Sequence, residues 1–178
     1  MSLITNTSQI PKSTKGHKGF TLIEILVALI ILSIGLLGIA SMQVQGMRNN
    51  QSAYLKSQAS ILAYDMADRM RANQARAIAG DYTPFDTTGT VPADPGCINS
   101  NAGCDAANQA TTDLFEWANK VNGTVNGIPM LPDAEGTIAV NAAGTIYTIT
   151  VTWKETQWDE ANNTNDVLDQ SFSINFSL

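Results

Sequence analysis

The feature that most constrains this chain is an apolar stretch of 21 residues, from Phe20 to Ala40. A helix of that length is long enough to cross the roughly 30 Å hydrocarbon core of a bilayer. One carboxylate, Glu24, lies just inside the stretch. On insertion scales an ionised side chain costs roughly 2.5–3.5 kcal/mol at the centre of a membrane helix. Basic residues on the N-terminal side, Lys12, Lys15 and Lys18, favour retention of that side in the cytoplasm. The sequence therefore predicts one membrane helix with an exported body, and the acid at its edge needs a reason.

The residues around the start of this stretch resemble the N-terminus of type IV prepilins and the related pseudopilins. The matching residues are Gly19-Phe20-Thr21-Leu22-Ile23-Glu24, followed by a run of Leu, Ile, Val and Ala. The resemblance implies that a membrane prepilin peptidase cuts between Gly19 and Phe20 and then N-methylates Phe20. Glycine suits the cut site because it has no side chain to hinder a close approach of the backbone. The resemblance also implies that Glu24 pairs with the Phe20 amine of a neighbouring subunit in a fibre.

Two other interpretations of the N-terminus stay open at this point. In an ordinary secretory signal, the three lysines would be the basic region, Ile25–Leu37 the apolar core and Gly38-Ile39-Ala40 the cut site. That interpretation leaves Glu24 unexplained and cuts inside what the pattern predicts as one helix. A plain single-span membrane protein would keep its first residue. The N-terminal residue of the mature protein distinguishes the three cases, since it would be Phe20, Ser41 or Met1.

The helical pattern continues well beyond the apolar stretch, because no proline and only one glycine occur between Ala40 and Ala79. We therefore expect a cleaved leader at residues 1–19, one long helix at 20–79 and a globular head at 80–178. Residues 20–40 of the helix would lie in the membrane or the fibre core. Two pairs, Asp65 with Arg69 and Asp68 with Arg71, are spaced for contacts on the helix surface. A stripe at three- and four-residue spacing predicts the face that packs under the head, with a partner surface as the alternative: Leu55, Ala59, Leu62, Met66 and Met70.

The head begins with a long stretch that is rich in turn residues. Several prolines and glycines between residues 80 and 112 predict a loop. Asp113 can cap a short helix, Leu114–Val121, with Phe115 or Trp117 turned inward. The paired cysteines, Cys97 and Cys104, lie inside the predicted loop.

The last 40 residues predict an antiparallel sheet, because apolar and polar residues alternate along them. Ile138 and Val140 form one short strand, Tyr147–Trp153 a second and Phe172–Leu178 a third, with 154–170 as the connection between the last two. One face of each strand is apolar and can cover the amphipathic half of the long helix. The fold class is therefore α+β, a long N-terminal helix whose C-terminal half packs on an antiparallel sheet. It agrees with the pilin fold.

The chemistry-bearing residues predict a structural protein. In an exported domain Cys97 and Cys104 form a disulfide by default, with free thiols as the alternative. The only histidine, His17, lies in the predicted leader, and the sequence has no catalytic motif or metal-ligand cluster. We expect no enzymatic activity, no cofactor and no metal. Removal of the leader takes away three lysines and no acid, so the acidic mature chain predicts no nucleic-acid binding.

A second resemblance covers more of the mature chain. Ser57-Gln58-Ala59 and the segment Leu62–Asn73 are similar to minor pilins of the PilV family. That family implies a low-abundance subunit of a priming complex at the pilus tip, which supports adhesion, twitching motility and surface sensing. The implied partners are the prepilin peptidase, the pilus assembly platform, the major pilin and other minor pilins, a tip adhesin and, before assembly, inner-membrane lipid. The implied location is the inner membrane with the head in the periplasm, then the tip of the pilus. The runner-up is a minor pseudopilin of a type II secretion system.

Overall fold

The computed structural model describes residues 19–123, 128–159, 162 and 164–178. The chain divides into two compact units, Met1–Gly46 and Met47–Leu178. The helix α1, Leu22–Ala72, contributes residues to both. In the first unit, every described residue of α1 is exposed. This part of the helix is largely apolar on all sides, yet within the described residues no other segment covers it. A helix of this kind is normally buried in a membrane or in a large protein core.

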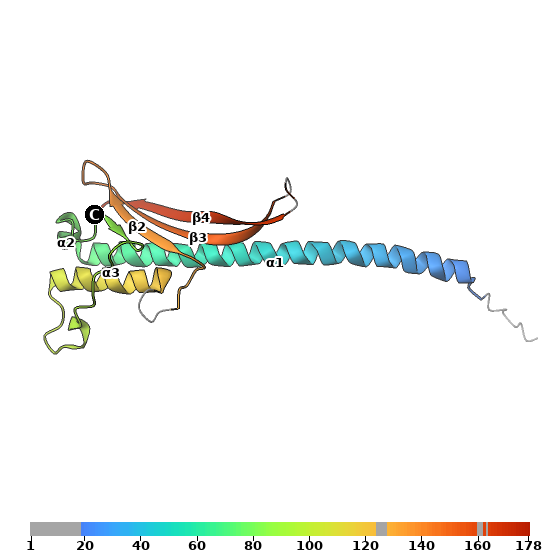
Figure 1. The fold of residues 1–178 in the computed structure, drawn as a ribbon, viewed down its shortest axis with the longest axis horizontal. Helices are drawn as coiled ribbons and strands as arrows, with labels where there is room; N and C mark the ends of the chain where they lie inside the picture. Colours follow the sequence, from blue (N-terminus) through green and yellow to red (C-terminus); the bar gives the residue numbers. More distant parts are fainter. Residues whose placement is uncertain (1–18, 124–127, 160–161, 163) are drawn as a thin grey trace, which may run out of the picture. The chain divides into compact units, whose positions relative to one another are not determined.

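The second unit combines the C-terminal part of α1 with two more helices and a four-stranded antiparallel sheet (Figure 1). The sheet order is β1-β2-β3-β4, so each strand pairs with the next one along the chain. A single turn of 3-10 helix, η1, lies between β1 and α3. The bounds of these elements are α2 Gln74–Ile78, β1 Phe85–Asp86, η1 Cys97–Asn99, α3 Ala106–Asn122, β2 Glu135–Val140, β3 Tyr147–Asp159 and β4 Thr164–Phe176.

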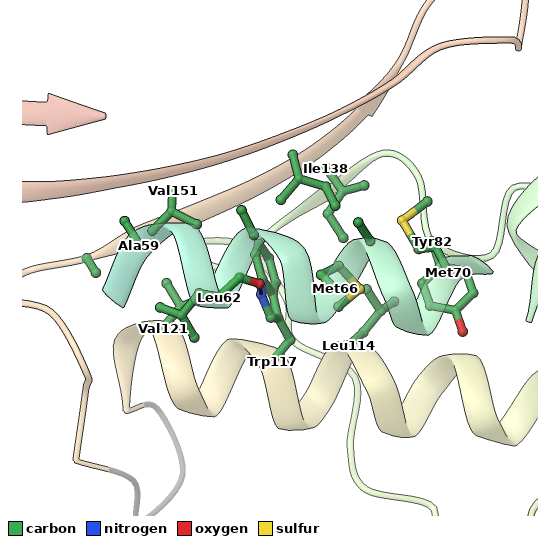
Figure 2. Close-up of a cluster of buried hydrophobic side chains, with 14 of the residues drawn as sticks. Ala59, Leu62, Met66, Met70, Tyr82, Leu114, Trp117, Val121, Ile138 and Val151 are labelled. Carbon is green, nitrogen blue, oxygen red and sulfur yellow. Dashed lines mark hydrogen bonds between the residues drawn. The ribbon is translucent and has the colours of Figure 1, made fainter. Parts of the chain in front are cut away.

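The core of this unit lies on two sides of α1. Figure 2 shows Val151 and Ile138 of the sheet against one side of α1, and Trp117 of α3 against the other. Trp117 is fully buried, and its indole Nε1 donates a hydrogen bond to the carbonyl oxygen of Leu62 at 2.9 Å. Gly136 of β2 leaves room for this ring, because a Cβ there would lie 2.5 Å from Cη2 of Trp117. One tryptophan therefore connects α3, α1 and the sheet.

The expected fold class is confirmed, since a long N-terminal helix packs its C-terminal part against an antiparallel sheet. The predicted apolar stripe of α1 is confirmed as core, from Leu55 to Met70. The alternation in the second predicted strand is also confirmed, because Ile149, Val151 and Trp153 are buried while the threonines between them are not.

The long helix ends earlier than the sequence predicted. α1 stops at Ala72, and α2 forms a separate five-residue helix up to Ile78, whereas we expected one helix through Ala79. Asn73 interrupts the helix because its backbone leaves the helical region, at φ −118° and ψ 48°. Its side-chain Nδ2 donates to the hydroxyl of Tyr82 at 3.2 Å and to the carbonyl of Ala106 at 2.7 Å. Contacts with distant segments thus hold Asn73 out of the helix.

The second predicted helix is longer, and Asp113 is not its cap. α3 begins at Ala106, where the side chain of Asp105 accepts a hydrogen bond from the backbone N–H of Asn108 at 2.8 Å. Asp113 lies in the middle of α3 and is buried. The expected loop at residues 80–112 therefore ends seven residues earlier than we predicted. Of the two aromatic candidates, Trp117 is the one turned fully inward.

The expected connection at 154–170 is largely a continuation of the two long strands. β3 and β4 pair over 13 consecutive positions, from Tyr147↔Phe176 to Asp159↔Thr164. The part of this connection at residues 160, 161 and 163 lies outside the described residues.

Candidate assembly site

The start of α1 carries the residues that the sequence singled out for processing. Gly19 and Phe20 precede the helix, and the Phe20 side chain is exposed. Thr21 caps the helix, because its hydroxyl oxygen accepts a hydrogen bond from the backbone N–H of Glu24 at 3.3 Å. Sequence reasoning missed this role, although the pattern Thr-x-x-Glu ahead of an apolar run is the signature of a capping box. The remainder of the predicted leader, residues 1–18, lies outside the described residues.

Glu24 lies in the first turn of α1 and is exposed. A carboxylate in this position interacts favourably with the positive end of the helix dipole. None of the ion pairs within the described residues includes Glu24. The helix therefore fixes the position of this carboxylate, and no cationic side chain of the described residues forms an ion pair with it. It can accept an ammonium group from a different chain.

The segment that follows Glu24 can cross a membrane by length and composition. Within the described residues, α1 is the one helix that meets this test, and its most apolar window buries nothing. Leu22 and Leu37 are 92% and 71% exposed, so these side chains require lipid or other protein around them. An apolar helix with one acid at its N-terminal end fits a membrane anchor that later packs among other helices.

The two cysteines form the expected disulfide. Cys97 begins η1, and Cys104 immediately precedes Asp105, the residue that caps α3. The Cys97 sulfur also lies 3.7 Å from the hydroxyl of Thr112 on α3. The bridge therefore ties the loop after β1 to the first turns of α3.

A group of charged and polar side chains joins α3 to α1 inside the head. Arg69 of α1 donates from Nη1 to Asp113 at 3.0 Å and to Glu116 at 2.8 Å, and from Nε to Asp65 at 3.3 Å. The hydroxyl of Tyr82 donates to Asp113 at 2.6 Å. Of these contacts, the sequence predicted only the Asp65–Arg69 pair. That prediction was incomplete because spacing within α1 carries no information about the acids that α3 brings to Arg69.

The ionisation of this group follows from its contacts. Burial by itself would lower the pKa of Arg69, but the hydrogen bond to Glu116 and the charges of Asp65 and Asp113 raise that pKa. Burial would raise the pKa of Asp65, but the hydrogen bond from Lys120 and the charge of Arg69 outweigh it and lower that pKa. Burial and the hydrogen bond to Asp113 both raise the pKa of Tyr82. At neutral pH Arg69 and Asp65 are therefore charged and Tyr82 is neutral.

The predicted site residues fall into two separate groups. Gly19, Phe20 and Glu24 belong to the first compact unit and lie within one turn of the start of α1. Cys97 and Cys104 belong to the second unit and staple the head. The first group holds the residues expected to be processed and to pair with another subunit. The disulfide of the second group constrains the fold of the head.

The family comparisons agree with this division. Residues 14–40 match a model described as the prokaryotic N-terminal methylation motif. Residues 41–115 match a model described as type IV pilin Tt1218, so the two matches together run from residue 14 to residue 115 without a gap. Together these matches support a type IV pilin. No match was found among curated proteins or among solved structures.

Type IV pilins are structural proteins and not enzymes, and the two matches give this chain the same character. The methylation motif implies processing by a prepilin peptidase and assembly with other pilins. The motif and the apolar part of α1 fit an anchor in the inner membrane before the subunit enters a pilus.

Proposed function

We propose that this pilin is a minor subunit of the type IV pilus, part of a priming complex at the tip. Such a complex initiates assembly and supports adhesion, twitching motility and surface sensing. The resemblance of Ser57-Gln58-Ala59 and Leu62–Asn73 to the PilV family supports the minor role. So does Ser41, which stands where major pilins often carry a proline and which α1 passes as regular helix.

The observation that carries the assembly part of the proposal is the exposed Glu24 carboxylate at the start of an exposed apolar helix. In this proposal the peptidase cuts between Gly19 and Phe20, and the new Phe20 amine is methylated. The amine of one subunit then pairs with Glu24 of the next. Pairing two opposite charges offsets the cost of a carboxylate in an apolar surrounding.

The first test measures the mature N-terminus. Edman degradation and mass spectrometry of the exported protein should give N-methylated phenylalanine, Phe20, as the first residue. Ser41 as the first residue would show a secretory signal, and Met1 an uncut membrane protein; either contradicts the proposal. Replacement of Gly19 by a bulky residue should leave the leader attached.

The second test separates the charge of Glu24 from its place in the helix cap. Glu24→Gln keeps the size of the side chain but removes its charge, so it should be processed and inserted but fail to enter pili. Thr21→Ala removes the cap hydroxyl and leaves the charge, and it should still be incorporated. The measurement is the amount of each variant in sheared fibres and in membranes. If both variants are incorporated into fibres equally poorly, Glu24 acts in helix initiation. If Glu24→Gln is incorporated normally, the proposed pairing is contradicted.

Two further measurements address the kind of fibre and the abundance. A deletion strain should lose surface piliation and keep normal secretion of exoproteins; the reverse result would identify a pseudopilin of a secretion system. In sheared pili the chain should be a small fraction of total pilin. A majority share would show a major subunit.

A further inference from the structure

One edge of the sheet in the head is long and uncovered. β4 is the last strand in the sheet and has 13 residues, more than twice the roughly 5–6 of an average strand. All 13 pair with β3 without a bulge, and none of them is buried. β1, at the opposite edge, has only two residues. Long regular edges are templates for another strand, and proteins usually protect them with bulges, prolines or charged side chains. β4 has no bulge and no proline, and its two charged residues, Asp166 and Asp169, lie in its first half, so the half from Gln170 to Phe176 is unprotected.

The free backbone groups of β4 can be assigned from the sheet register. The N–H of Lys154 in β3 donates to the carbonyl of Pro132 at 3.1 Å, so Lys154 does not bond to its partner in β4, Asp169. In an antiparallel pair, bonded and non-bonded positions alternate. Ser171, Ser173 and Asn175 therefore direct their N–H and C=O groups away from the sheet. Within the described residues, no group of the chain bonds to these backbone atoms.

An apolar strip lies beneath this edge, where β4 runs along α1. The Phe172 ring is 6.4 Å from the Tyr64 ring, and the guanidinium of Arg71 is 4.8 Å from the Phe176 ring. Phe172 and Phe176 are only partly buried, and Tyr64 is 52% exposed. Ile61, one helical turn from Tyr64, is 53% exposed. A strand added beside β4 would cover side chains that the head's own sheet leaves half open.

A second copy of the chain does not fit this edge within a fibre. Subunits of a fibre are joined by heterologous contacts, in which one patch meets a different patch of the next subunit. A β4–β4 contact between copies is isologous, so it closes as a dimer and does not propagate. In a heterologous contact between sheet edges, β4 would meet β1, which has only two residues to pair with the 13 of β4. Neither edge of a second copy therefore supplies a matching strand in a fibre, which favours a different protein as its source.

We propose that β4 accepts an extended strand of a non-identical pilin subunit, which continues the sheet by one strand. The donated strand would carry apolar side chains at alternate positions over Tyr64 and Ile61. Its other side chains would be polar, because the outer face of the sheet is made of Thr and Ser, as in the Thr150–Ser173 hydroxyl contact of 2.8 Å. This inference rests on the proposed function, since it requires that the chain assembles with other pilins.

The first experiment maps the neighbour of β4 in cells that assemble pili. A photo-crosslinking residue replaces Ser173 in the full-length chain. A matched variant carries it at Thr137, which lies in the same row of the sheet, two strands or about 9–10 Å from the edge. We expect an adduct from Ser173 to a different pilin, at a segment with alternating apolar residues, and none from Thr137. An adduct to a second copy, equal adducts from both positions, or no adduct from either would overturn the proposal.

A second experiment removes one outward backbone donor. Proline is tolerated in an edge strand where its N–H would face solvent, so Ser173→Pro should fold with a melting temperature within a few degrees of the parent protein. Ile174→Pro removes a donor to β3 and should destabilise the head. With the crosslinker at Ser171, Ser173→Pro should lower the adduct yield by about tenfold, since a lost bond and the ring both disrupt the added strand.

An unchanged adduct yield in folded Ser173→Pro would overturn the proposal, as would destabilisation equal to that of Ile174→Pro. Each strain is first checked for a Phe20 N-terminus and for the chain in sheared pili. Failure at that check contradicts the proposed function, whereas failure of the crosslink alone contradicts only the role of β4.

Discussion

Replacement of Asp113 by alanine should destabilise the head more than any exposed ion pair can explain. The Asp113 side chain is 4% exposed and accepts three hydrogen bonds, from Arg69 at 3.0 Å, from Gln109 at 2.9 Å and from Tyr82 at 2.6 Å. The substitution leaves the Tyr82 hydroxyl and one side of the Arg69 guanidinium without an acceptor inside the head.

Removal of one partner of a buried ion pair costs about 3–5 kcal/mol. Arg69 keeps Asp65 and Glu116, so the lower end of that range, about 3 kcal/mol, is the expected loss of unfolding free energy. For a chain of this size such a loss lowers the melting temperature by about 6–12 °C. Asp113→Asn keeps the volume and part of the hydrogen bonding and should fall between the parent and Asp113→Ala.

The assay is thermal and urea unfolding of the full-length protein in detergent, followed by the fluorescence of tryptophan, since Trp117 is buried in the head. The matched control is Asp68→Ala, which removes a 2.7 Å pair with Arg71 whose Asp68 side chain is 73% exposed. That control should lose no more than about 1 kcal/mol. If Asp113→Ala and Asp68→Ala unfold at the same temperature, the buried contacts of Asp113 stabilise the head no more than an exposed ion pair does. That result would contradict the expected loss of about 3 kcal/mol.

Three other predictions follow from contacts in the head. Gly136→Ala should destabilise it by about 1–3 kcal/mol, measured by urea unfolding, because the new Cβ meets the Trp117 ring. Burial raises the pKa of Tyr82, so the folded chain keeps the phenol proton at a pH where the unfolded chain has lost it. The unfolding free energy should therefore fall as the pH rises above about 10. Thermal melts of Tyr82→Phe over the same pH range should show a smaller fall. Replacement of both Cys97 and Cys104 by serine should cost about 2–3 kcal/mol, and an equal melting temperature with and without reductant in the parent protein would contradict it.

The sequence predicted the parts of the fold that local pattern determines. The stripe of α1 from Leu55 to Met70 and the alternation in Tyr147–Trp153 each repeat with the period of one regular element, and each was found buried as expected. The motif from Gly19 to Glu24 was recognisable because its residues are adjacent in the chain. These features need no knowledge of what lies across from them.

The parts that could not be predicted depend on contacts between distant segments. Asn73 ends α1 because it bonds to Tyr82 and Ala106, and nothing in the residues around Asn73 indicates that. Asp113 was mistaken for a helix cap because a buried acid in mid-helix is intelligible only once Arg69 is opposite it. The far ends of β3 and β4 are mostly polar and show no alternation that would predict strands. Their pairing continues the register of the Tyr147–Trp153 segment.

The direction of β4 along α1 has a mechanical consequence. From Tyr64 to Arg71 on the helix, the contacts advance from Phe172 to Phe176 on the strand, so the two elements run the same way. A tensile load along this part of α1 therefore shears several rows of contacts at once, whereas a load across it would peel them one after another. Forced unfolding is governed by the rate of unfolding, and that rate is lower when several rows of contacts must break together. The head is arranged to resist tension along its helix and to yield to sideways pulling.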